Sequence, residues 1–217
     1  MNKFSFRDNP SVSDGRYSSV QLSFYQTKKE DSTGFGEIHN DWNVKAEAAM
    51  GPRNKNYISL YADVTHRIIT MGTSRLFNPY LGIVFKAGVT KGELPLQKVF
   101  GLESALSRYA FASSFRTAGI YELLGDNFYS ASVEYNFRDI LFILLGVPSL
   151  HVDFVIRGAT SSFWTNSHGL QNVILSRAIQ YREFTIGLGR VADIFRIDFS
   201  YAKYHGRRFA VTLTSFL

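Results

Sequence analysis

Apolar and polar residues alternate along most of this chain, most sharply in residues 194–217. That stretch contains two alternating runs that meet near Gly206. Period-two alternation indicates β-strands whose faces have different surroundings, and a glycine between two such runs indicates a turn. One face of the first run is apolar and the other is charged or small: Phe195, Ile197, Phe199 and Tyr201 lie opposite Arg196, Asp198, Ser200 and Ala202. The pattern therefore predicts a β-hairpin over residues 194–217.

The same alternation recurs through the rest of the chain. It predicts seven further strands, over residues 17–26, 41–50, 56–65, 80–89, 128–137, 150–160 and 183–190. A weaker pattern at residues 108–114 indicates a short tenth strand. The longest apolar run, Ile140–Leu145, is far shorter than the ~18 residues of a membrane-spanning helix. The sequence thus predicts one all-β domain, residues 1–217, with nine to ten antiparallel strands.

Two stretches interrupt the alternation. Residues 90–127 form a long segment in which the pattern weakens, and loops of this length in a domain are usually functional or disordered. Residues 138–149 contain the apolar run and end near Pro148. We expect both stretches to connect strands.

The two faces of each strand leave two architectures open. A β-sandwich would bury the apolar faces between two sheets, whereas a transmembrane β-barrel would turn them toward lipid. The predicted strands have the ~9–11 residues that a tilted strand needs to cross a bilayer. Several end in aromatic residues, as the interfacial girdles of a barrel do: Tyr135, Phe137, Tyr201 and Tyr204. These features favour an antiparallel transmembrane β-barrel.

The amino-acid composition limits the kinds of binding and catalysis that we expect of this chain. Aromatic residues make up 15% of the chain, with 19 Phe and 12 Tyr, which favours strands over helices. The net charge of +6 would suit nucleic acid, but Lys and Arg are scattered singly rather than clustered, so we expect no nucleic-acid partner. The absence of Cys excludes disulfides and thiolate chemistry. His151 and Asp153 stand close on one strand, but no serine lies in a nucleophile-elbow motif. We therefore expect no enzyme activity, no cofactor and no metal.

Five segments in order resemble a known family: LPLQKVFGLESALSRYAF, LLGDNFYSASVEYNF, GVPSLHVDFVIRGA, EFTIGLGRVADIFRIDFSYAK and RRFAVTLTSFL. Together they are similar to the C-terminal half of barrels in the bacterial surface-antigen superfamily, which are sixteen-stranded outer-membrane proteins of assembly and translocation. The likeness covers about residues 94–217. It is closest to members from Bacteroidota whose barrel follows a carboxypeptidase-regulatory-like domain.

The resemblance implies several roles. Residues 90–127 would be an extracellular loop that folds back into the lumen, with an arginine near its tip against the barrel wall; Arg108 is the nearest match, although the family's glycine is missing, and Arg116 is a second candidate. Residues 138–149 would be a periplasmic connection. The last strand resembles the C-terminal signal read by the barrel-assembly machinery, with Phe209, Val211, Leu213 and Leu217 at alternating positions.

Four charged residues are expected to face the lumen as a ladder that stiffens the wall: Asp153, Arg157, Arg196 and Asp198. Nine to ten strands fit either a small ten-stranded barrel or the second half of a sixteen-stranded one, and the resemblance favours the half. The N-terminal strands would then come from another chain or have been lost. The expected function is a non-catalytic barrel of the bacterial outer membrane, embedded in lipid and active in assembly, translocation or solute passage. The alternative is a soluble or surface-exposed β-sandwich that binds a partner.

Overall fold

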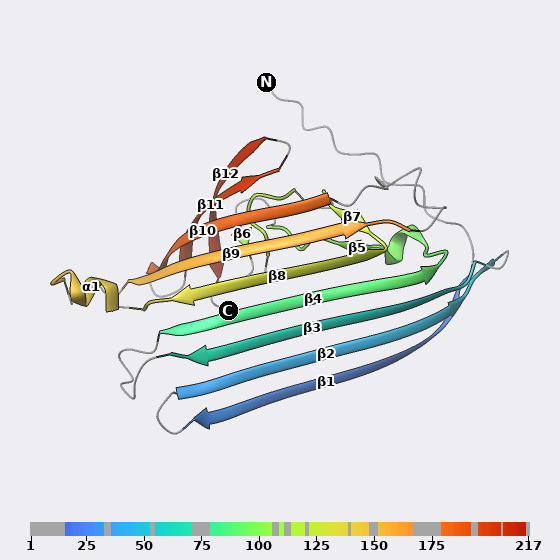
Figure 1. Cartoon of the computed structure of the whole chain (residues 1–217), viewed down its shortest axis with the longest axis horizontal. Coiled ribbons are helices and arrows are strands. Elements are labelled where there is room, and N and C mark those ends of the chain that lie inside the picture. The colour runs from blue at the N-terminus through green and yellow to red at the C-terminus, as the bar shows by residue number, and fades with distance from the viewer. Residues whose placement is uncertain are drawn as a thin grey trace.

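The computed structural model describes residues 16–32, 36–52, 55–70, 79–105, 109–110, 114–119, 122–138, 140–147, 152–166, 179–191, 195–204 and 206–215. Within them, nine long antiparallel strands form one sheet in chain order (Figure 1). They are β1 (Ser18–Ser32), β2 (Gly36–Met50), β3 (Tyr57–Ile69), β4 (Tyr80–Gly92), β8 (Asn127–Asn136), β9 (Asp153–Trp164), β10 (Ile179–Val191), β11 (Phe195–Lys203) and β12 (Arg207–Ser215). The predicted all-β, antiparallel fold is confirmed.

Short elements lie between the long strands. The connection from β4 to β8 contains the 3-10 helix η2 (Leu96–Lys98) and three two-residue strands, β5 (Phe100–Gly101), β6 (Tyr109–Ala110) and β7 (Leu124–Gly125). The connection from β8 to β9 begins with the short helix α1 (Ile140–Leu144), which includes most of the apolar run. Among the described residues, no helix is both long enough and apolar enough to cross a membrane.

The strands are longer than the sequence pattern predicts. β1 and β2 each have 15 residues, and their pairing continues from Ser18–Met50 to Ser32–Gly36. The alternation of side chains fades after Gln26, among charged residues, but the backbone ladder does not depend on side-chain hydrophobicity. Pairing with a neighbour therefore extends a strand beyond its apolar stripe.

The sheet does not close into a barrel. In the described residues β1 pairs only with β2, and the far side of β12 pairs with β6 alone, in parallel, at Leu213 and Thr214. Because nine strands alternate in direction, β1 and β12 run the same way, so direct contact between them would make a parallel pair. Of the two alternatives left by the strand count, the small closed ten-stranded barrel is therefore wrong.

The two faces of the sheet differ sharply in character. The outer face exposes large apolar side chains along its whole width, with Leu22 73%, Ile58 63% and Phe209 76% exposed. The inner face buries charged side chains, including Arg157 and Arg196 at 2% exposure and Asp198 at 0%. Leu22, Ile58 and Phe209 follow the predicted alternation, because successive side chains of a strand point to opposite faces.

The described residues of 93–126, here called the inward segment, lie against the inner face. Leu102, Phe115 and Leu123 of this segment join one apolar cluster with Phe128 and Phe163 of the sheet. The predicted long connection therefore starts after Gly92, where β4 ends, and packs back onto the strands. Residues 139, 148 and 149 of the predicted 138–149 connection lie outside the described residues.

Candidate functional site on the inner face

Arg116 anchors the inward segment to the sheet. Its backbone N–H donates to both carboxylate oxygens of Glu183 on β10, at 3.0 and 2.9 Å, and the N–H of Thr117 adds a third bond at 2.8 Å. Its side chain extends to β11, where Nε lies 3.1 Å from Asp198 Oδ2, with both side chains fully buried. The guanidinium also donates to the Ser114 carbonyl oxygen. The part of the inward segment at Arg116 and Thr117 thus contacts two strands of the sheet, β10 and β11.

Asp198 receives donors from three directions. In addition to Arg116, Arg196 Nη2 donates to Oδ2 at 3.2 Å while its Nε forms an ion pair with Oδ1 at 2.8 Å, and Thr214 Oγ1 donates to Oδ2 at 2.5 Å. Thr214 stands opposite Arg196 in the register of β11 and β12. This carboxylate therefore links the last hairpin to the inward segment.

Arg196 crosses two strands to reach its second partner. Its Nη1 lies 3.0 Å from Glu134 Oε2 on β8, with β9 and β10 between. The space comes from Gly187, which is opposite Asp198 on β10. A Cβ at Gly187 would lie 2.4 Å from Asp198 Oδ1 and 3.1 Å from Arg196 Cδ. A side chain at this position would block the guanidinium's path.

Arg157 completes a balanced group. Its Nη1 lies 3.4 Å from Glu183 Oε1, and its guanidinium carbon stands 5.6 Å from the centre of the Phe115 ring. Three arginines and three carboxylates, here called the inner charge cluster, thus meet on β8–β11 and the inward segment: Arg116, Arg157, Arg196, Glu134, Glu183 and Asp198. A buried charge is tolerated when it is paired, whereas loss of one partner typically costs about 3–5 kcal/mol.

Asp153 belongs to a separate group at the end of the strands that carries α1. Its fully buried carboxylate accepts bonds from Arg138 Nη1 at 3.0 Å, Asn136 Nδ2 at 3.0 Å and Arg190 Nε at 2.6 Å. The four charged residues expected to form one ladder all face inward. They are divided, however, with Asp153 in this group and Arg157, Arg196 and Asp198 in the inner charge cluster.

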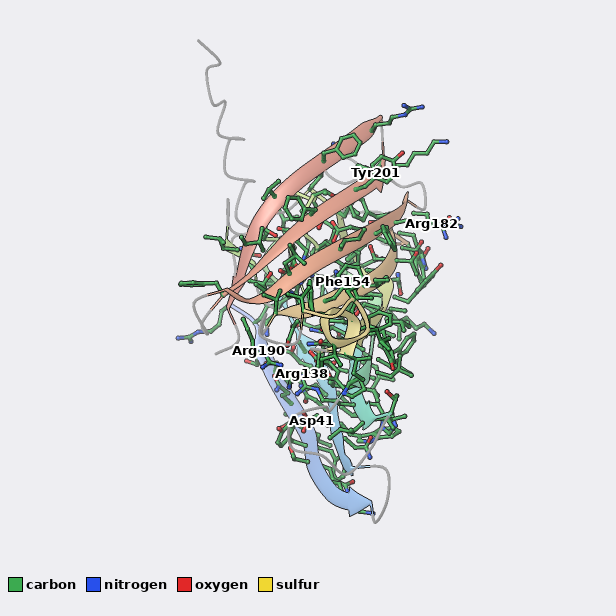
Figure 2. All side chains as sticks on the ribbon, turned by 90° about the vertical axis from the view of Figure 1, so that its left-hand side faces the viewer. Asp41, Arg138, Phe154, Arg182, Arg190 and Tyr201 are labelled. Atoms are coloured by element: carbon green, nitrogen blue, oxygen red, sulfur yellow. The ribbon has the colours of Figure 1, made fainter. Side chains whose placement is uncertain are left out.

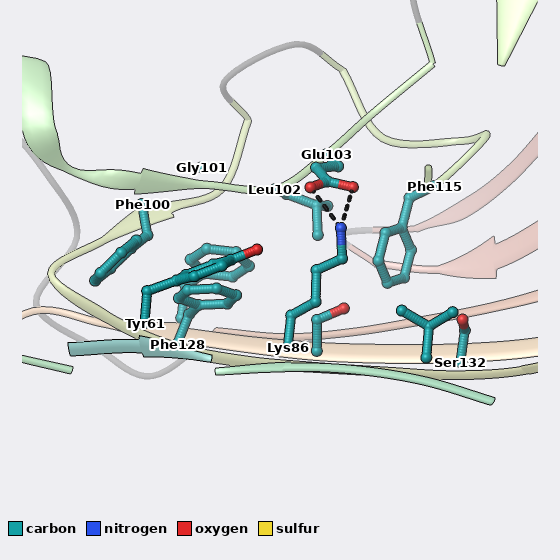
Figure 3. Close-up of a pocket in the computed structure, with 12 residues that line it drawn as sticks. Tyr61, Lys86, Phe100, Gly101, Leu102, Glu103, Phe115, Phe128 and Ser132 are labelled. Atoms are coloured by element: carbon teal, nitrogen blue, oxygen red, sulfur yellow. Dashed lines mark hydrogen bonds and ion pairs between the residues drawn. The ribbon is translucent and has the colours of Figure 1, made fainter. Parts of the chain in front are cut away.

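A hollow of about 80 Å³ lies between the inward segment and β3, β4 and β8 (Figure 3). Lys86 from the sheet and Glu103 from the segment pair across it, at 2.7 Å. Its other end is lined by aromatic rings, with Phe100 and Phe128 tilted against each other and 4.9 Å apart between centres. A second hollow, of about 220 Å³, shares Tyr61 and Phe100 with the first and continues over β1–β3.

The remaining sequence-predicted site residues fall in different places. Phe209 and Val211 are exposed on the outer face, and Leu213 is partly buried where β6 pairs with β12. Arg108, Leu217 and His151 lie outside the described residues. Sequence reasoning missed Glu183 as the acceptor of the inward segment and Glu134 as the distant partner of Arg196. The sequence feature that marks Glu183 and Glu134 is a charged side chain at a strand position that faces inward.

The chemistry of the inner face is that of ion pairing. Among the described residues, no group of three or more His, Asp or Glu side chains is placed to hold a metal ion. Comparison of the chain with models of known families, with curated proteins and with solved structures found no significant match.

Proposed function

We propose that this chain is the lipid-embedded wall of a bacterial outer-membrane β-barrel, without catalytic activity, that serves assembly, translocation or passage across that membrane. The observation that carries the proposal is the inverted burial of the sheet. Soluble proteins bury large apolar side chains and expose charges, and rarely leave apolar patches beyond a few hundred Å². Here Asp198 is buried while Leu22 and Phe209 are mostly exposed.

The sandwich alternative has less support. It requires a second sheet to cover the outer apolar face. In the part of the chain that the structure describes, the second sheet consists of β5 and β7 alone, with two residues each, and both belong to the inward segment. The apolar face needs another cover, and lipid is the cover that suits a whole face at once.

The open edges define the partner that the wall needs. Unpaired backbone groups in lipid cost several kcal/mol each, so a strand edge at that depth must be paired. Because β1 and β12 run in the same direction, an odd number of further strands would close the sheet with antiparallel pairs only. We propose that these strands come from another part of a longer protein or from a partner chain, and that barrel-assembly machinery inserts the product.

Membrane fractionation tests the proposal. In membranes of the cells that make it together with its closing strands, the protein should stay in the outer-membrane pellet after high salt and carbonate and be released by detergent. Release by salt or carbonate would contradict the barrel and favour the sandwich.

A neighbouring pair of substitutions sharpens this test. Leu22 and Ser23 are adjacent on β1 and both are exposed, Leu22 on the outer face and Ser23 on the inner face. In water, arginine would be tolerated at both positions. In lipid, Leu22→Arg should cost about 2–4 kcal/mol near the bilayer centre, whereas Ser23→Arg would remain in the lumen. Selective loss of carbonate-resistant protein in Leu22→Arg supports a lipid-facing outer surface, and equal behaviour of the two variants contradicts it.

A further inference from the structure

The apolar segment that follows β8 has little protein around it. Residues 140–147, with the sequence ILFILLGV, contain α1 and the turn that ends it, and they carry no polar side chain. None of these residues is buried, and Leu144, Leu145 and Val147 are 79%, 66% and 45% exposed. A helix that is apolar on every side is normally buried in protein or in a membrane. The segment therefore needs a cover that the described part of the chain does not supply.

The backbone at the end of α1 satisfies its own hydrogen bonds. Gly146 has a φ of 76°, and its N–H donates to the carbonyl oxygen of Ile143 at 3.0 Å. The N–H of Val147 donates to the carbonyl oxygen of Phe142 at 2.9 Å. These two bonds form a Schellman motif, which closes a helix on a residue in the left-handed conformation, usually glycine. Polar backbone groups are costly in lipid unless they are paired, so this closed end suits an apolar surrounding.

α1 begins beside aromatic side chains at the ends of two strands. The N–H of Ile140 donates to the carbonyl oxygen of Phe137 at 3.3 Å. The ring of Phe137 lies 4.6 Å from that of Tyr135 and 5.7 Å from that of Phe154, between centres. Figure 1 shows α1 beyond the ends of β8 and β9, and Figure 2 views the sheet from that end. Aromatic rings at the ends of barrel strands are typical of the membrane–water interface.

A second aromatic pair marks the opposite end of the same strands. Trp164 at the end of β9 and Tyr129 near the start of β8 have ring centres 6.4 Å apart. Phe154 and Trp164 are ten positions apart on β9, which corresponds to about 34 Å of extended strand. At a tilt of about 40°, this length covers about 26 Å across a bilayer, close to the ~25 Å apolar band of outer-membrane barrels. The two aromatic groups are thus spaced as two membrane interfaces are, and α1 adjoins one of them.

We propose that residues 140–147 are an interfacial anchor, which lies in the headgroup region of the bilayer and buries Leu144, Leu145 and Val147 among lipid acyl chains. Eight residues are too few to cross a bilayer, which takes about 20 in a helix, so the segment lies along the membrane surface. Lipid suits it better than a protein partner, because protein interfaces carry a polar rim with hydrogen bonds and these eight residues offer no polar side chain. The inference rests on the proposed function, which brings lipid to the outer face.

Depth-dependent fluorescence quenching tests the anchor. The chain contains no Cys, so one introduced cysteine at a time carries the fluorescent probe. Leu144→Cys places the probe on α1, Phe85→Cys places it on the outer face in the middle of β4, and Ser23→Cys places it on the inner face of β1. All three side chains are exposed, so labelling should preserve the fold. The labelled protein, with its closing strands, is reconstituted in phosphatidylcholine vesicles whose lipids carry a nitroxide either near the headgroup or near the bilayer centre.

The three probes separate the anchor from the barrel wall. At Leu144→Cys the shallow nitroxide should quench several-fold more strongly than the deep one, at Phe85→Cys the deep one should be stronger, and Ser23→Cys should resist both. Quenching at Phe85→Cys alone, or stronger deep than shallow quenching at Leu144→Cys, overturns the anchor and leaves the wall in place. Shallow quenching at Leu144→Cys without quenching at Phe85→Cys supports the anchor and contradicts the wall. Absence of quenching at both positions contradicts both proposals.

Discussion

The two sides of the sheet, β8–β12 and β1–β3, differ in how far their polar inner face is covered. Over β8–β12 the inward segment covers the face, and charges are buried in the inner charge cluster. Over β1–β3 most inner-face side chains are half-buried or exposed, and the ion pairs of this face, such as Lys98–Glu47, are partly exposed. Buried pairs are strong only while complete, whereas exposed pairs contribute little. We therefore expect β8–β12 to be rigid and sensitive to substitution. We expect β1–β3 to tolerate substitution.

The largest difference should appear when one carboxylate is removed from each half. Asp198→Ala leaves Arg116 and Arg196 without their shared partner, and should lower the free energy of unfolding by about 3–5 kcal/mol. Asp63→Ala removes a side chain that is 24% exposed and lies 3.6 Å from Lys86, and should cost less than about 1 kcal/mol. Urea unfolding in detergent micelles measures both. Similar losses would show that burial does not distinguish the halves.

An intermediate effect is expected at the glycine that lets Arg196 pass. Gly187→Val places methyl groups where Asp198 and Arg196 now lie, and overpacking of this kind typically costs about 1–3 kcal/mol. Gly158→Val on the adjacent strand is the matched control, because a Cβ there meets nothing within 4 Å. It should leave the unfolding free energy unchanged or raise it slightly, since β-branched residues favour strands. A loss in Gly158→Val equal to that in Gly187→Val would remove the explanation by crowding.

The smallest effect should come from the ion pair that spans the hollow between the inward segment and the sheet. Glu103 is 50% exposed and Lys86 is 15% exposed, so Glu103→Gln should cost under about 1 kcal/mol. The exposed Lys55–Glu93 pair provides the comparison, and Glu93→Gln should change the unfolding free energy by even less. A loss of several kcal/mol in Glu103→Gln would mean that this pair, rather than Arg116, holds the inward segment.

The sequence predicts the strands well because alternation is local. Each apolar stripe, such as Val20, Leu22 and Phe24, is visible without knowing the neighbouring strand, and all nine long strands were found in this way. The ends of β1 and β2 were missed because their pairing depends on the partner's backbone. Alternation alone left both a closed ten-stranded barrel and an open half-barrel possible, because the direction and pairing of the edge strands are properties of the whole sheet.

The candidate site was predictable only in part. Arg116 was a candidate because it lies in the long connection, and Arg196 and Asp198 because they occupy inward positions. Their contacts depend on three facts with no local signal: the fold of the inward segment, the register that places Gly187 beside Asp198, and the reach of Arg196 to Glu134. Arg190, which the sequence analysis assigned to neither face, reaches Asp153 on the inner face after a register shift between Leu188 and Val191.

The parallel pairing of β6 with β12 makes two events compete. Leu213 and Thr214 pair with Tyr109 and Ala110, on the side of β12 that a further strand would use. A new strand that pairs with β12 along its whole length must displace β6 from Leu213 and Thr214. Docking of the inward segment and pairing of a new strand with β12 therefore oppose each other. A change that strengthens one of these two interactions weakens the other by the same coupling free energy.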